Sequence, residues 1–175
     1  MRGVLYRLLS TIVRNIDRLN DLIGRAIAWL TLAMVLVTCA VVIVRYVFNL
    51  GSIALQESVM YMHGIVFLFG IAYTLKERGH VRVDVLYERF PGRVRTIVDL
   101  LGHLLLLIPV ALFILIGSLD YVSFSWSLGE ASAQPGGLPG VFLVKSLIPA
   151  MAFLLLLQGI AEVLRSVSNL AGWAE

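Results

Sequence analysis

The stretch RAIAWLTLAMVLVTCAVVIVR, residues 25–45, is a mostly apolar run closed at each end by an arginine. Three further runs without charged side chains follow, at residues 58–75, 100–119 and 146–161. A helix needs about 17–25 apolar residues to cross the hydrocarbon core of a bilayer. The sequence therefore predicts an all-α integral membrane protein with four transmembrane helices, forming one membrane domain over residues 1–175. The expected spans cover about residues 24–46, 56–76, 98–120 and 143–164.

Positive charge is distributed unevenly around these spans. Most of the 14 Lys and Arg residues either precede the first span or lie between the second and the third. Cationic segments near span ends are retained in the cytoplasm, so both termini and the middle loop are predicted to be cytoplasmic. A mean hydropathy of +0.92 with 14% charged residues excludes a soluble globular domain. The net charge of +3 then reflects membrane topology, and nucleic-acid binding is not expected.

Residues 1–21 have an amphipathic pattern. Apolar side chains recur along one side of the expected helix: Leu5, Leu8, Leu9, Ile12, Val13, Ile16 and Leu19. Arginines take the other side: Arg2, Arg7, Arg14 and Arg18. The pattern predicts a collar helix, either lying in the cytoplasmic headgroup layer or packed on a partner's cytoplasmic surface. The sequence leaves both placements open.

Three side chains within the spans could suggest redox or proton chemistry. At 1.5 Å per residue, His63 is about 9 Å below the outer end of its span and His103 about 6 Å above the inner end. That difference in depth excludes a shared bis-histidine haem, so each histidine is expected to pack between helices with a hydrogen bond. Cys39 is the one cysteine, which excludes an intramolecular disulfide or a dithiol redox pair, and we expect it to be buried.

The spans carry no Asp, Glu, Lys or Arg near the midplane, and no pair of broken half-helices of the kind that binds solutes in transporters. Pro109 is expected to kink the third span. These features predict neither catalytic residues, nor metal ligands, nor a cofactor. They favour a scaffold that does not itself move a charged solute, and the alternative is a membrane anchor subunit of a redox complex.

Short motifs in the loops resemble those of the small membrane subunit of tripartite ATP-independent periplasmic (TRAP) transporters. The matching segments are RYVFN at 45–49, Glu57, GHVRVD at 79–84, Ser127, EAS at 130–132, PGGLP at 135–139, Lys145 and IP at 148–149. The most specific of them are HVRVD and PGGLP. The resemblance runs from about residue 17 to residue 165.

This resemblance implies a small, non-enzymatic scaffold subunit of a sodium-coupled secondary transporter for organic acids, either carboxylates or 2-oxo acids, in a bacterial inner membrane. The subunit would brace a large elevator-type membrane subunit, which carries the sodium and substrate sites, and would work with a periplasmic solute-binding protein. No cofactor is implied. The residues expected at partner interfaces are Arg45, Asn49, Glu57, His80, Arg82, Asp84, Glu130, Ser132, Pro135, Gly136, Gly137 and Lys145.

Overall fold

The computed structural model describes residues 2–77, 79, 87 and 89–172. Within these residues every regular element is a helix: α1 (Arg2–Val47), α2 (Ile53–Lys76), α4 (Gly92–Gly102), η1 (His103–Leu107), α5 (Ile108–Leu128) and α6 (Val141–Leu170). Four helical segments are long and apolar enough to cross a membrane: Tyr6–Val47, Ile53–Lys76, Gly92–Leu128 and Val141–Leu170. The predicted all-α class with four spans is confirmed.

The helices extend beyond the apolar runs because local signals set their ends. Helix α2 begins at Ile53 because Ser52 caps it, with the Ser52 side chain accepting a hydrogen bond from the Leu55 N–H at 3.3 Å. Helix α4 begins directly after Pro91, which has no N–H to donate and is therefore tolerated next to the first turn of a helix.

Helix α1 joins the predicted collar to the first span without interruption. Its 46 residues correspond to a rod about 69 Å long, whereas a hydrocarbon core is about 30 Å thick. A large part of α1 therefore lies outside the hydrocarbon. Whether that part rests in the headgroup layer stays a prediction.

The third span contains a short π-helix, η1, in which the Ile108 N–H donates to the His103 carbonyl five residues earlier. Pro109 explains this widened turn, because proline has no N–H and its ring collides with the carbonyl of the residue four positions before it. At this level η1 lies close to α6. A Cβ on Gly159 would lie 2.4 Å from Leu107 Cδ2, so this close contact requires a glycine at position 159.

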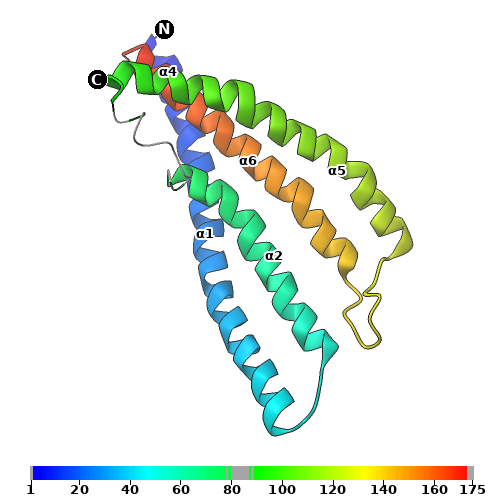
Figure 1. Ribbon diagram of the computed structural model, residues 1–175. Coiled ribbons are helices and arrows are strands. Elements are labelled where there is room, and N and C mark those ends of the chain that lie inside the picture. Colours follow the sequence, from blue (N-terminus) through cyan, green and yellow to red (C-terminus); the bar gives the residue numbers. More distant parts are fainter. Residues whose placement is uncertain (1, 78, 80–86, 88, 173–175) are drawn as a thin grey trace.

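The helices form a curved layer in the order α1, α2, α6 and α5 (Figure 1). Helix α6 packs against α1, α2, α4, η1 and α5, and half of the buried residues in the described part of the chain lie on it. Both termini lie at one end of this layer and the 129–140 loop lies at the other (Figure 1). These are called the termini end and the loop end below. Their assignment to cytoplasm and periplasm stays a prediction.

Charged side chains mark these two ends at a spacing close to the thickness of a membrane. On α2, Glu57 and Lys76 are separated by about 28 Å of helix. On α6, Lys145 and Glu162 are separated by about 25 Å. Both spacings are close to, and slightly below, the thickness of a hydrocarbon core, about 30 Å.

Candidate functional site

At the loop end, Glu57 holds the 129–140 loop onto the first turns of α2. Its carboxylate accepts hydrogen bonds from the Ser132 hydroxyl and from the Leu138 backbone N–H, the latter at 2.6 Å. Ser132 and Leu138 also pair through their backbones, with the Ser132 N–H donating to the Leu138 carbonyl at 3.0 Å. A Cβ on Gly137 would lie 2.4 Å from Ser132 Oγ and 2.8 Å from Glu57 Oε1. Glycine at position 137 therefore lets the loop close over the carboxylate.

A second carboxylate joins the end of α5 to the start of α6. Glu130 accepts hydrogen bonds from Lys145 Nζ and from Ser125 Oγ, each at 2.5 Å. Ser125 is fully buried, and Lys145 Nζ lies 4.2 Å from the centroid of the Tyr121 ring. The Lys145 hydrogen bond, followed by that of Ser125, holds the pKa of Glu130 below its ordinary range. Glu130 and Lys145 thus form a charged clasp within this chain.

The structure brings together some of the residues predicted from sequence and separates others. Glu57, Ser132 and Gly137 meet in one cluster, and Glu130 and Lys145 meet in another. The remaining loop-end residues are exposed: Pro135, Gly136, Arg45 and Asn49. Asn49 has a left-handed backbone at φ 52°, in the tight connection from α1 to α2. The residues expected at the cytoplasmic face, His80, Arg82 and Asp84, lie outside the described residues.

At the termini end, a buried polar network joins α1 to α6. Asn20 Nδ2 donates to Gln158 Oε1 at 2.7 Å, and both side chains are fully buried. Gln158 Nε2 donates to Glu162 at 3.1 Å and to Asp17 at 3.3 Å. Arg165 completes the network by pairing with Glu162 and, at 2.8 Å, with Asp17. The amide hydrogen bond is thus fully buried, whereas the Arg165–Asp17 ion pair beside it is partly exposed, at 28% and 23% of the two side chains.

Sequence reasoning missed this network. Its signal was helical spacing, because Gln158, Glu162 and Arg165 stand four and three residues apart and share one face of α6. Asp17 and Asn20 share a face of α1 in the same way. Which helices would bring the two faces together was not visible in the sequence.

Lys76 adds a second contact at the termini end. Its ammonium group pairs with Asp21 of α1 and, at 2.8 Å, with the neighbouring Glu77. Helix α1 is thus held to α6 by the buried network and to α2 by an ion pair. The α1 residues that make these contacts all lie between positions 17 and 21, about one helical turn.

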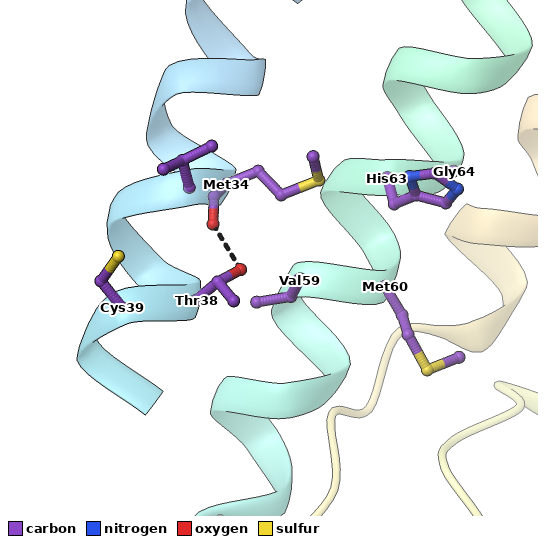
Figure 2. A pocket seen from close by; sticks show the side chains of 8 residues that line it. Met34, Thr38, Cys39, Val59, Met60, His63 and Gly64 are labelled. Atoms are coloured by element: carbon purple, nitrogen blue, oxygen red, sulfur yellow. Dashed lines mark hydrogen bonds between the residues drawn. The ribbon is translucent and has the colours of Figure 1, made fainter. Parts of the chain in front are cut away.

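Between α1 and α2, towards the loop end, the surface contains an apolar groove of about 550 Å³. It is lined by Met34, Val35, Thr38, Cys39, Val59, Met60, His63 and Gly64. Figure 2 shows Met34 extending from α1 towards α2, and the Thr38 hydroxyl bonded back to the Met34 carbonyl at 2.7 Å.

Two expectations about the groove residues were wrong. Cys39 is exposed rather than buried. His63 is also exposed, and its ring stacks on Phe67 with 6.2 Å between the centroids. Among the described residues, neither His63 ring nitrogen has a hydrogen-bond partner. Two side chains that the sequence assigns to helix packing, one on α1 and one on α2, therefore face outward in this chain.

His103 has different surroundings. It lines a polar pocket between α4 and the last turns of α6, together with Asp99, Glu162 and Arg165. No group of three His, Cys, Asp or Glu residues within the described part of the chain could hold a metal ion.

Two comparisons with known proteins identify the family of this chain. Residues 34–169, more than half of the chain, match the family model described as "Tripartite ATP-independent periplasmic transporters, DctQ component". The C4-dicarboxylate TRAP transporter small permease protein DctQ of Vibrio cholerae is 35% identical over 95 residues, covering 54% of this chain and 40% of that relative. No solved structure matches the chain. The chain therefore belongs to the DctQ family of TRAP transporter components, and it is a multi-pass transport subunit of the bacterial inner membrane rather than an enzyme.

Proposed function

We propose that this chain is the fixed brace of a sodium-coupled TRAP transporter for organic acids, and that it supports a large membrane subunit which carries solute and sodium. The proposal rests mainly on one observation, which is that polar side chains have their bonding partners within this chain. At both ends of the layer they bind one another: Glu57 with Ser132, Glu130 with Lys145, and Gln158 with Asn20. Between the two ends, the spans hold no Asp, Glu, Lys or Arg that could accompany a charged solute.

A brace must keep its shape while a neighbouring domain moves. The network of Asp17, Asn20, Gln158, Glu162 and Arg165 fixes α1 on α6, and Lys76 fixes α2 on α1. Because buried polar partners lose their hydrogen bonds when helices slide, such a network resists changes in helix register. The rigid termini end is what a static scaffold requires.

The loop end supplies a second rigid surface. The hydrogen bonds of Glu57 and the Glu130–Lys145 clasp hold the 129–140 loop in one conformation. They leave Pro135 and Gly136 exposed at the tip of the loop. We place this surface in the periplasm, where it would face the solute-binding protein. On this proposal Glu57 and Glu130 act indirectly, by shaping the loop, since both carboxylates are already bonded within the chain.

Reconstitution tests the proposal directly. Liposomes containing this chain alone, the large subunit alone, or both would be given the binding protein, an inward sodium gradient and either a radiolabelled C4-dicarboxylate or a 2-oxo acid. The C4-dicarboxylate is chosen because the Vibrio cholerae relative bears that name. We expect uptake only with both membrane subunits, and only with sodium. Uptake by this chain alone would contradict the role of a brace.

A further inference from the structure

We propose that the groove between α1 and α2, with the α2 face carrying Met60, His63 and Phe67, is the docking surface for a transmembrane helix of the large subunit. The occupant is a helix that presents a hydrogen-bonding side chain to His63. This inference rests on the proposed function and specifies which face of the brace meets the partner.

The depth of His63 is the first argument. It lies about 9 Å of helix beyond Glu57, which stands at the polar level of the loop end. The imidazole is therefore below the headgroup level, and its side chain is too short to reach back to water. A polar group facing hydrocarbon without a hydrogen bond is costly, and such groups in membrane proteins face protein or a water-filled cavity.

The second argument is that no residue in the described part of the chain satisfies the imidazole. His63 is exposed, its ring stacks on Phe67, and neither ring nitrogen has a hydrogen-bond partner among those residues. Thr38, which carries a hydroxyl in the groove lining, donates its hydrogen bond to the Met34 carbonyl (Figure 2). Acyl chains can neither donate nor accept a hydrogen bond, so lipid does not complete this surface.

The third argument is shape. Met60 and Phe67 flank His63 at positions three before and four after it on α2, and their side chains are 68% and 63% exposed. Beside them lies the 550 Å³ groove, walled on its other side by Met34, Val35 and Cys39 of α1. A ridge next to a groove is how helices interlock. Methionine side chains also adapt to the shape of a partner.

Photo-crosslinking in the assembled complex tests the docking surface. The photoreactive p-benzoylphenylalanine would replace Phe67 in one variant and Phe113 in another, each co-expressed with the large subunit. Phe113 is a matched control because it is also an exposed phenylalanine, at 78%, but lies on α5 beyond α6. We expect crosslinks to the large subunit from position 67 and not from position 113. Crosslinks from position 113 alone, or from position 67 to lipid alone, would overturn the inference.

A second pair of variants tests the hydrogen bond itself. We expect His63→Leu to lower recovery of the large subunit with the tagged chain by about threefold to tenfold, the range that intramembrane hydrogen bonds support. His63→Gln, which keeps a donor and an acceptor, should restore it. The thermal unfolding temperature of the isolated His63→Leu chain should not fall, because the imidazole has no hydrogen-bond partner among the residues that the structure describes. Equal recovery with Leu and Gln would refute the assignment.

These experiments separate the inference from the proposed function. If the wild-type complex forms but position 67 gives no crosslink to the large subunit, the proposed docking face is wrong and the brace role stands. If the large subunit never co-purifies with the wild-type chain, the brace role fails and the docking surface fails with it.

Discussion

The side-chain amides of Asn20 on α1 and Gln158 on α6 meet at 2.7 Å where both are fully buried. Gln158 turns its NH₂ group towards the carboxylates of Asp17 and Glu162, so its carbonyl oxygen must face Asn20. The orientation of one amide thereby sets the other. The two helices are locked in a single register at the termini end.

Gln158→Leu should destabilise the isolated chain by about 1–3 kcal/mol, because it strands the buried Asn20 amide and removes a donor from two carboxylates. Thermal unfolding in detergent would measure the loss. The control is the double variant with Asn20→Leu, which removes both amides. Its cost should be smaller than the sum of the two single costs, and strictly additive costs would show that the amides do not interact.

The Glu130–Lys145 clasp predicts a dependence on acidity. The pKa of Glu130 is lowered from its ordinary value of 4.5, chiefly by the Lys145 hydrogen bond and then by that of Ser125. A carboxyl group whose pKa falls on folding stabilises the fold above its unfolded-state value, and this contribution is lost as the pH drops through the folded-state value.

Comparison with Glu130→Gln reveals this contribution. The wild-type chain should unfold at a higher temperature than the variant near neutral pH, and the difference should shrink to nothing as the pH is lowered below 4.5. A difference that stays constant across the acid range would mean that the clasp carries no charge.

Glu130→Lys, which places a second cation beside Lys145, should impair uptake by the complex without lowering expression.

Gly137→Ala should loosen the 129–140 loop. The added methyl group would meet Ser132 Oγ at 2.4 Å and crowd the Glu57 carboxylate, a strain of about 1–3 kcal/mol. Hydrogen exchange at the Leu138 amide, which Glu57 protects in the wild-type chain, should accelerate. Gly51→Ala is the matched control, since nothing lies within 4 Å of its added Cβ. Equal exchange rates in the two variants would argue against the crowded approach.

The main features of the fold could be predicted because they depend on properties of single segments. Apolar length identified the four spans. The position of Pro109 predicted a distortion, and the structure shows its form as a π turn ending at Leu107. These signals lie within a few residues of their effect, so no knowledge of the tertiary arrangement was needed.

What could not be predicted depends on which faces meet. The pairing of Asn20 with Gln158 joins positions 138 residues apart, and nothing local in either helix specifies the partner. The exposure of Cys39 and His63 was missed for a related reason. In a membrane, a face that meets lipid and a face that meets another helix can have the same apolar composition.

The continuity of α1 has a mechanical consequence. Asp17, Asn20 and Asp21 fasten this rod at a point nearer its first residue than its last, so the fastening acts as a fulcrum with unequal arms. Any rocking of the short arm swings the tip near Tyr46 through a wider arc. Tightness at the fulcrum therefore contributes, together with the packing of α1 on α2, to how steadily the far end of the helix is held.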